Sequence, residues 1–515
     1  MDRHKQAVTK IASAVKGFFE RGEPFRITHG STNSTRPRPS QRLVDISSLS
    51  NVLSVDRVTR TALVEPNVPM DRLVEHTLKH GLVPPVVMEF PGITAGGGYA
   101  GTAGESSSFK HGFFDETVNE VEMVLGNGDV VRANRSNQYA DLFRGAAGAV
   151  GSLGVTTLLE LNLLEAKKYV QTTYHRAGSV AEAIAKVREE TANPENDYVD
   201  GILFSKNHGV VVTGKLTDEK PSEATARTFS GAWDPWFYMH VQDSTRSPAD
   251  RRVTEYLPLA EYLFRYDRGG FWVAACAFTY FWFVPFTRFF RWFLDDFLHT
   301  RMMYRALHAS GQSARFVVQD LNLPYENAEK FVDYTADEFG IWPLWLCPLK
   351  QTPPPTFHPH TGEIITSKDP ATGKATQIPA EKESLNIGLW GWGPADYAAF
   401  LRKNVSLEAK LQELNGMKWL YAHTYYSQPQ FWDVYGGSAT RKWYDALRAK
   451  YHAATLPTVY DKVKIDVEAR QKELAERKGS FKNMWPVAGV YGIYKAIKSR
   501  DYRLHRDAKW KYKGE

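Results

Sequence analysis

Residues 90–112 read FPGITAGGGYAGTAGESSSFKHG, a stretch of small residues in which few side chains could fill a hydrophobic core. It contains the pattern G-x-G-x-x-G over residues 96–101. A Rossmann dinucleotide fingerprint needs a strand directly before its first glycine and a helix directly after its last. Here a Pro-Gly pair separates the strand-like VVMEF from the glycines, and the TAGESSS that follows is a poor helix former. The context therefore excludes a nicotinamide-dinucleotide fingerprint.

The same stretch has a second interpretation. Consecutive small residues expose backbone N–H groups in concave arcs, and such nests bind anionic groups such as pyrophosphate. RITHGSTNSTR (26–36) and GSLGV (151–155) have the same character. Each stretch alone is compatible with an ordinary turn-rich loop, but three of them within one region favour a cradle for a nucleotide.

Composition excludes several classes of protein. The chain has 515 residues, 43% hydrophobic and 24% charged, so it can bury sizeable cores in two or three domains. A net charge of +6 without zinc-finger spacing argues against nucleic-acid binding. Two distant cysteines, Cys276 and Cys347, are too few for a disulfide framework or a structural zinc site, which predicts no metal centre and a reducing compartment.

The order of elements predicts an α+β fold. Residues 1–24 form an amphipathic helix without a visible signal sequence. Strands and glycine turns then alternate to about residue 170, including a hairpin at Asn127-Gly128. This irregular order is not the repeated βαβ pattern of a doubly wound sheet. Residues 352–382 are rich in Pro, Gly, Thr and Lys and predict an exposed loop.

The motifs, taken in order, resemble a known family. RITHGSTNSTR, LVEPNVPMDRLVEHTLKHGLVPPV, TAGGGYAGTAGESSSFKHGFF and GSLGVTTLLELNLLEAKKYV are similar to the FAD domain of vanillyl-alcohol-oxidase-type (PCMH-type) flavoproteins. Within that superfamily the chain resembles the delta-24-sterol reductases, the Diminuto-like enzymes. The shared stretches ESSSFKHG, LEAKKYV, FVVQDLNLP, WPLWLCPL and YAHTYYSQPQFWDVYGGS extend the resemblance from about residue 25 to 465.

The resemblance implies a domain organisation. Residues 25–170 would form the PCMH-type FAD-binding domain with two α/β subdomains, and 171–410 an α+β cap that covers the flavin. Residues 411–465 would return to complete the flavin site. Beyond the resemblance, the residues of 466–515 themselves predict a basic amphipathic tail.

The resemblance also implies the cofactor-binding residues, with recognition through the backbone. They are Thr28, His29, Gly30, Ser31, Thr32, Asn33, Ser34, Thr94, Gly96, Gly97, Gly98, Gly101, Gly104, Ser106, Ser107, Ser108, His111, Gly112, Gly151, Gly154 and Val155. His29 and His111 could each tether FAD covalently, but the relatives favour non-covalent binding. NADPH would reduce the flavin, although the sequence contains no motif that binds it.

The side-chain double bond of a delta-24 sterol, the substrate that the resemblance implies, is an isolated alkene, and its chemistry points to the catalytic candidates. No neighbouring carbonyl can take up the negative charge that hydride addition would create, so a proton must reach the less substituted carbon while a hydride reaches the other. Tyr421, His423 and Tyr425 would share one face if 421–427 is a strand, although a hydrogen-bonded core strand fits equally well. Asp320 is a further candidate acid, with a surface aspartate as the alternative. Tryptophans such as Trp345, Trp390 and Trp392 could stabilise a cation.

The resemblance therefore implies an FAD-dependent ene-reductase that acts on the side chain of a delta-24 sterol or a similar prenyl-tailed lipid. An alcohol or amine oxidase (or dehydrogenase) of the same fold, and a sterol- or lipid-binding protein without turnover, are the alternatives.

Two segments suggest contact with a membrane. Residues 269–287, GGFWVAACAFTYFWFVPFT, carry no charge, and aromatics alternate with charges up to about residue 300. A proline and the excess of aromatics favour a monotopic patch over a full span, with a buried pair of cap helices as the alternative. The basic tail, interleaved with Trp and Tyr, has two equal interpretations: it contacts anionic headgroups, or it is simply solvated. We therefore expect an enzyme associated with an intracellular membrane, the endoplasmic reticulum.

Overall fold

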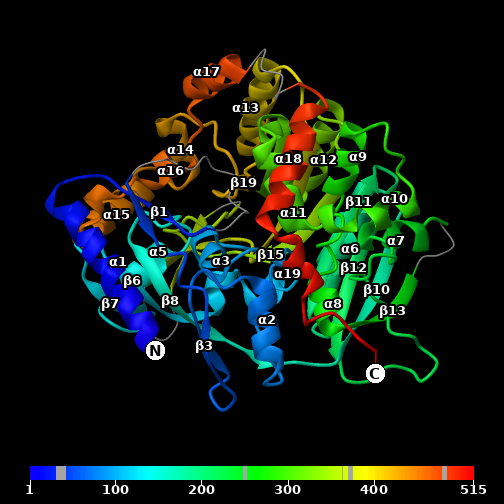
Figure 1. The fold of residues 1–515 in the computed structure, drawn as a ribbon, viewed down its shortest axis with the longest axis horizontal. Helices are drawn as coiled ribbons and strands as arrows, with labels where there is room; N and C mark the ends of the chain where they lie inside the picture. The colour runs from blue at the N-terminus through cyan, green and yellow to red at the C-terminus, as the bar shows by residue number, and fades with distance from the viewer. Residues whose placement is uncertain (31–41, 248–251, 362–363, 369–374, 478–483, 515) are drawn as a thin grey trace.

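The computed structural model describes residues 1–30, 42–247, 252–361, 364–368, 375–477 and 484–514. Helices and mostly antiparallel sheets occur together, which confirms the predicted α+β class. Two large sheets dominate the molecule, one near the N-terminus and one in the middle of the chain (Figure 1).

The N-terminal sheet has five antiparallel strands in the order β3-β4-β8-β6-β7. Gly128, at φ +92°, makes the tight turn between β6 and β7 that the Asn-Gly pair predicts. Two smaller pairs, β1 with β2 and β5 with β9, flank this sheet. The strands are β1 Arg26–Thr28, β2 Leu43–Asp45, β3 Val52–Asp56, β4 Thr61–Val64, β5 Leu82–Val83, β6 Val118–Val124, β7 Val130–Asn134, β8 Val155–Asn162 and β9 Leu164–Glu165.

Helix α1 (Asp2–Glu20) covers part of this region because Val8, Ile11 and Val15 repeat at helical spacing and form one buried stripe. The stripe packs against Val124 and Val155. The other helices of the region are short: α2 Met70–Leu78, α3 Ala95–Gly101, α4 Ser108–His111, η1 Phe114–Thr117 and α5 Ala140–Ala146.

The cap is built on an eight-stranded antiparallel sheet in the order β13-β10-β12-β11-β15-β18-β14-β19. The strands are β10 Tyr169–Ala177, β11 Tyr198–Ser205, β12 His208–Thr217, β13 Arg252–Pro258, β14 Phe316–Leu323, β15 Leu344–Lys350, β18 Glu383–Trp392 and β19 Met417–Lys418. The sheet therefore extends slightly beyond both ends of the 171–410 region. The division of the chain into domains remains our proposal.

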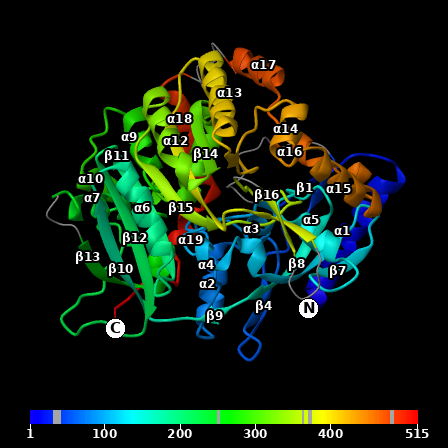
Figure 2. The same cartoon turned by 180° about the vertical axis from the view of Figure 1, so that it is seen from behind.

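Alternation along these strands gives the sheet two different faces. On one face Leu321, Ile387 and Leu389 pack under helices α6 (Val180–Thr191), α12 (Tyr325–Glu338) and α13 (Tyr397–Glu413). Figure 2 shows these helices on the side of the sheet that faces the viewer. The intervening residues, such as Asp320 and Trp390, project to the other face and line a cavity.

The aromatic segment forms short helices between β13 and β14. They are α8 Leu259–Leu263, α9 Val273–Tyr280, α10 Arg288–Phe293, η2 Asp295–Phe297, α11 Thr300–Ala309 and η3 Gln312–Arg315, with α7 Phe237–Ser244 preceding β13. Within the described parts of the chain, no helix has both the length and the apolar character to cross a bilayer.

The chain then returns to the N-terminal region. Helices α14 (Gln428–Val434), α15 (Gly437–Lys450) and α16 (Val459–Val463), with η4 (Ala453–Thr455), follow β19. The Tyr444 hydroxyl donates to Ser152 Oγ at 2.7 Å, and the Phe25 N–H donates to the Thr455 carbonyl at 3.1 Å. The two ends of the chain therefore build one unit. The tail continues as α17 Val467–Arg477, α18 Val487–Ser499 and α19 Tyr502–Arg506.

The prediction of an exposed loop over 352–382 is wrong for its first part. Phe357 and His358 are buried, and His358 Nε2 lies 2.9 Å from a carboxylate oxygen of the buried Asp115. This contact fastens the segment to the N-terminal region. Farther along, β16 (Ile364–Lys368) and β17 (Ala375–Pro379) pair as an antiparallel hairpin.

Candidate active site

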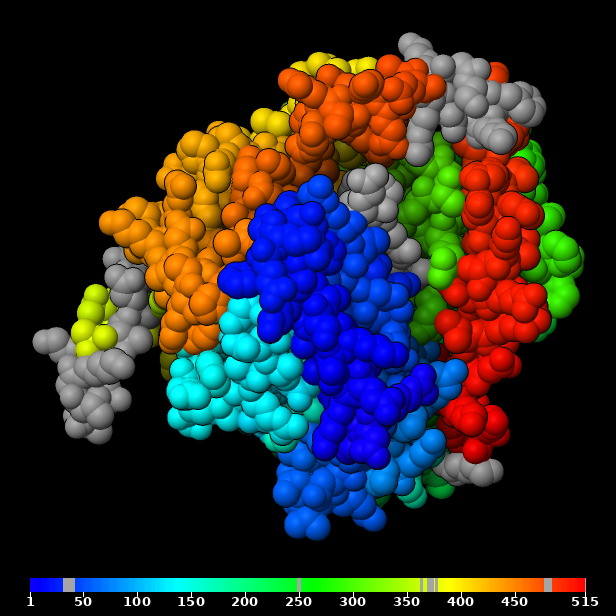
Figure 3. All heavy atoms as spheres, turned by 60° about the vertical axis from the view of Figure 1, so that its left-hand side comes forward, coloured from blue at the N-terminus to red at the C-terminus, as the bar shows by residue number. Residues whose placement is uncertain are grey.

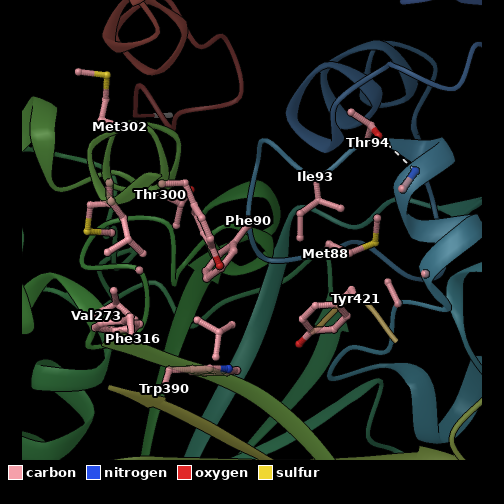
Figure 4. A pocket seen from close by; sticks show the side chains of 18 of the residues that line it. Met88, Phe90, Ile93, Thr94, Val273, Thr300, Met302, Phe316, Trp390 and Tyr421 are labelled. Atoms are coloured by element: carbon pink, nitrogen blue, oxygen red, sulfur yellow. Dashed lines mark hydrogen bonds between the residues drawn. The ribbon is translucent and has the colours of Figure 1, made fainter. Parts of the chain in front are cut away.

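A cavity of about 670 Å³ lies between the N-terminal region and the cap. Figure 4 shows Met88, Ile93 and Thr94 entering it from the N-terminal region, and Val273, Met302 and Phe316 from the cap. Trp390 and Tyr421 lie along a shared wall. The cavity thus meets residues of the 25–170, 171–410 and 411–465 segments, as an active site shared between domains requires.

One wall of the cavity consists of the glycine-rich segments that the sequence predicts as a nucleotide cradle. The predicted residues that line it are Thr28, His29, Gly30, Thr94, Gly96, Gly97, Gly101, Gly104, Gly151 and Gly154. A Cβ built on Gly101 meets no protein atom within 4 Å, so the space before Gly101 is open cavity. Gly30 and Gly151 have φ of +73° and +72°, a conformation that favours glycine.

Within the glycine stretch, Ala95–Gly101 form helix α3. Thr94 caps the helix, because its Oγ1 accepts the Gly97 N–H at 3.2 Å (Figure 4). Gly98 faces away from the cavity, where a Cβ would lie 2.6 Å from Met88 Cε and 2.9 Å from Phe114. Gly98 is therefore required for packing, not for contact with a ligand.

Other predicted cofactor residues also lie outside the cavity lining. Ser106, Ser107, Ser108, His111, Gly112 and Val155 do not line it. Instead, Ser107 Oγ donates to the Pro85 carbonyl at 2.8 Å, and Ser108 Oγ accepts the Glu105 N–H at 2.8 Å. These serines fix the loop that follows the cradle. Ser31, Thr32, Asn33 and Ser34 fall outside the described residues.

Two cations stand at the glycine-rich wall. Lys462, from α16, donates to the carbonyls of Val150 and Gly151 at 3.0 and 2.7 Å and also lines the cavity. Arg26, from β1, lines the cavity and donates to the Asp461 carbonyl at 3.4 Å. A cradle of glycines with two cations fits a dinucleotide that carries a pyrophosphate.

The opposite wall is apolar and mostly aromatic. Its aromatic residues include Phe90, Phe271, Phe278, Tyr280, Phe281, Phe297, Tyr304, Phe316, Trp345, Trp390, Trp392 and Trp419. Phe90 comes from the N-terminal region, and the others come from the aromatic segment and the short helices after it, the cap sheet and the returning segment. This wall suits a large hydrocarbon and offers several π faces.

Asp320 is buried in the cap sheet and lines this cavity, so the alternative of a surface aspartate is wrong. Its carboxylate accepts the Asn386 Nδ2–H at 2.9 Å and the Trp390 Nε1–H at 3.3 Å. Burial raises the pKa of Asp320 to about 7, although the two hydrogen bonds oppose the shift. Asp320 can therefore hold a proton near neutral pH.

A second buried carboxyl, Glu89, lines the cavity beside an ion cluster. Arg265 Nη2 lies 2.8 Å from Asp200 and 3.7 Å from Glu89 Oε1. Burial raises the pKa of Glu89 to about 8, although the guanidinium of Arg265 opposes the shift. Arg265, Tyr266 and Trp345 all donate hydrogen bonds to Asp200. Because Arg265 is paired with Asp200, it offsets little of the cost of burying a charge on Glu89.

The three candidates of the returning segment do not share a face, because 421–427 is not a strand. Tyr421 lines the main cavity, whereas His423 and Tyr425 border a second, smaller one. A buried Glu408–Lys418 ion pair holds the backbone of 421–427 in this irregular conformation. Lys418 donates to the His423 carbonyl, and Glu408 accepts the Tyr425 N–H at 3.0 Å.

Sequence reasoning missed Glu89, Arg265 and Lys462 as parts of the site. Glu89 adjoins the quoted glycine stretch, and a glutamate inside the apolar run VVMEF is a signal that could have found it. Arg265 stands in a similar apolar and aromatic context. Nothing in the local sequence distinguishes Lys462 from the neighbouring lysine Lys464.

Comparison with known proteins agrees with this geometry. Residues 6–134 match the FAD binding domain family. The chain is 27% identical over 480 residues to the Delta(24)-sterol reductase of Homo sapiens, covering 89% of this chain and 86% of the relative. It is 26% identical over 480 residues to the rat enzyme of that name, with the same coverage. The Arabidopsis thaliana enzyme is 26% identical over 521 residues, covering 93% and 88%.

The resemblance that the motifs suggest is confirmed, as is the PCMH-type FAD-binding fold class. The chain is an FAD-dependent oxidoreductase.

Proposed function

We propose that this FAD-dependent oxidoreductase, a homologue of the Delta(24)-sterol reductases, reduces the side-chain carbon-carbon double bond of a delta-24 sterol or similar prenyl-tailed lipid, with NADPH as electron donor. One observation carries the proposal. A single cavity joins a glycine-rich wall with two cations to an aromatic wall that contains the buried acid Asp320.

The glycine-rich wall would hold FAD without a covalent bond. Thr28, Gly30, Gly101 and Gly151 supply backbone and open space, and Lys462 is placed to neutralise phosphate charge. When bound and reduced, FAD supplies a hydride.

Asp320 supplies the proton in this proposal. The protonated carboxyl transfers its proton to the less substituted alkene carbon, and the C=C π pair forms the new C–H bond. The other carbon, now a tertiary cation, receives the hydride, so that one proton and one hydride saturate the bond. Asp320 is left as a carboxylate, and the Asn386 and Trp390 N–H donors stabilise this charge until it regains a proton.

The aromatic wall performs two further tasks. It excludes water, which would otherwise capture the transient cation. The π faces of residues such as Trp390, Trp392 and Tyr421 can stabilise the cation while it exists. We assign no catalytic role to His423 or Tyr425, since neither lines this cavity.

The test is an anaerobic titration of the FAD-loaded protein with NADPH, followed through the visible flavin band. We expect the band to bleach and then to recover on addition of a delta-24 sterol, but not of its saturated counterpart. A band that NADPH leaves unchanged and an alcohol or amine bleaches would identify an oxidase or dehydrogenase instead. Sterol binding without any flavin reduction would identify a lipid-binding protein.

The role of Asp320 is tested in the same experiment with Asp320→Asn. Asparagine keeps the shape and one acceptor oxygen but cannot donate an acidic proton. We expect unchanged bleaching by NADPH and recovery with the sterol slowed by about 10²–10⁴-fold. Equal recovery rates would remove Asp320 from the mechanism and leave the overall reaction intact.

We also propose that the enzyme works at an intracellular membrane, the endoplasmic reticulum, because its proposed substrate dissolves in lipid rather than in water. The aromatic segment supports this location through its exposed side chains Trp282, Phe283, Phe286, Phe289 and Phe293.

A further inference from the structure

Helix α18 has an inverted distribution of side chains. Its buried residues are small and follow a four-residue spacing on one face: Ala488, Gly492 and Ala496. Several of its large apolar residues point outward instead, with Val490 55% exposed, Tyr494 54% and Ile497 45%. A helix at a water-facing surface normally buries the large residues and exposes polar ones. Small residues inside and large apolar residues outside is the arrangement of helices that pack within lipid.

Close backbone approach explains the small inner face. A Cβ on Gly492 would lie 2.5 Å from the Ala306 carbonyl oxygen of α11. A Cβ on Gly489 would lie 2.5 Å from both Tyr280 and Phe281. Helix α18 therefore packs tightly on the cap through its small residues. This packing fixes the rotation of the helix and leaves its large apolar residues on the outer side. Figure 1 shows α18 alongside α11.

A second segment extends this exposed surface. Trp485, just before α18, stacks on Trp282 with ring centroids 6.1 Å apart, and its Nε1–H donates to the Tyr280 carbonyl at 2.8 Å. Trp282 is 72% exposed. We define the apolar face as Trp282, Phe283, Met484, Trp485, Val490, Tyr491, Tyr494 and Ile497, all of which are exposed. Figure 3 shows the C-terminal segment, in red, at the surface beside green cap residues.

We propose that the apolar face inserts into the surface of a lipid bilayer that contains anionic headgroups, and that substrate passes from this bilayer into the cavity beside α18. With 13 residues, α18 is about 20 Å long, too short to cross a hydrocarbon core of about 30 Å. It therefore lies in the plane of the membrane.

Charge complementarity favours an anionic bilayer over a second protein. Lys495 and Lys498 are exposed on α18 next to the apolar residues. Residues 484–514 contain eight Lys or Arg and only two acidic residues. Trp and Tyr mixed with basic residues are typical of the membrane-water interface.

Continuity with the cavity supports the route of the substrate. Phe281, Gly489 and Ile493 line the cavity. Each of them directly precedes a residue of the apolar face, namely Trp282, Val490 and Tyr494. The same helix is thus an inner wall of the cavity and an outer contact with lipid. The route depends on the proposed function, whereas insertion into a bilayer does not.

The experiment is co-flotation of the FAD-loaded full chain with phosphatidylcholine vesicles, with and without phosphatidylserine. The variant is Val490→Ser/Tyr494→Ser/Ile497→Ser. A matched control, Val58→Ser/Val130→Ser/Val405→Ser, changes apolar residues that are also exposed but lie on other elements. We expect stronger binding to the anionic vesicles, a loss of at least tenfold in the α18 variant, and no change in the control.

A second measurement is decisive on the wild-type protein itself. Lipids brominated in the acyl chains should quench the tryptophan fluorescence of the wild-type protein, and the double variant Trp282→Phe/Trp485→Phe should lose this quenching. Absence of vesicle binding and of quenching in the wild type would overturn the proposal, as would a dimer that the α18 variant dissociates in light scattering. Substrate turnover in detergent would continue in either case, so these outcomes leave the proposed function intact.

Discussion

Replacing Asp320 with asparagine should change how stability depends on pH. In the folded protein, burial raises the pKa of Asp320 from its ordinary value of 3.8 to about 7. Between these two values the folded state holds a proton that the unfolded state has released. The stability contributed by the protonated carboxyl is therefore present below about pH 4 and is lost as the pH rises to about 7.

The magnitude follows from the shift. Three pKa units correspond to about 4 kcal/mol between the two protonation states. Relative to low pH, the wild type has lost about 2 kcal/mol of the stability contributed by protonated Asp320 at pH 5 and about 4 kcal/mol at pH 8. Asparagine does not titrate, so Asp320→Asn should become more stable relative to the wild type by about 2 to 3 kcal/mol between these two pH values.

The assay is thermal unfolding of both proteins at equal FAD loading, at pH 5 and pH 8. For a chain of 515 residues the unfolding entropy is about 1 kcal/mol/K, so we expect the difference in Tm between variant and wild type to grow by about 2 to 3 °C. Other titrating groups, such as Glu89, are common to both proteins and cancel in the difference. The control Asp337→Asn removes an exposed carboxyl of α12 and should show no such growth. A Tm difference independent of pH would refute the inference that Asp320 holds a proton at neutral pH.

Three further outcomes are expected from other parts of the structure. Gly101→Leu fills the open space of the cradle, so the ratio of flavin to protein absorbance should fall at least tenfold while circular dichroism stays unchanged. The control Gly17→Leu, at a half-buried position of α1 where a Cβ meets only the end of the Arg21 side chain, should retain FAD. Lys418→Met leaves the Glu408 carboxyl buried without its cation and should lower the free energy of unfolding by about 3 to 5 kcal/mol in urea, a loss that a second change, Glu408→Leu, should partly restore. Tyr421→Phe keeps the π face at the cavity, so flavin reoxidation by the sterol should slow less than tenfold in stopped-flow measurements, because the proton comes from a carboxyl group; a loss above 100-fold would assign the proton to the phenol.

The predictable parts of the site were those with local causes. A glycine run exposes its backbone wherever the chain places it, so Gly101 and Gly151 could be assigned to a cradle from sequence. The Asn-Gly turn at Gly128 likewise depends only on its own backbone. The family resemblance added the order of the segments and the nature of the cofactor.

The parts that could not be predicted depend on distant partners. The course of 421–427 follows from the buried Glu408–Lys418 pair, which no periodicity of the segment records. Burial of Asp320 depends on Trp390 and Asn386 from a neighbouring strand. In sequence Gly98 cannot be distinguished from its neighbours in the glycine run, yet Met88 and Phe114 pack so close to it that no side chain fits there.

The joining of the chain's two ends has a consequence for biosynthesis. Phe25 bonds to Thr455, and Ser152 to Tyr444, so the flavin-binding unit lacks part of its structure until almost the whole chain has left the ribosome. At about 5 to 20 residues per second, the N-terminal segment waits about 20 to 90 seconds for its partner. The cap sheet, whose strands lie between Tyr169 and Lys418, can assemble during that interval. Nascent chains should therefore acquire the cap sheet first, the capacity to bind flavin after it, and helix α18 last.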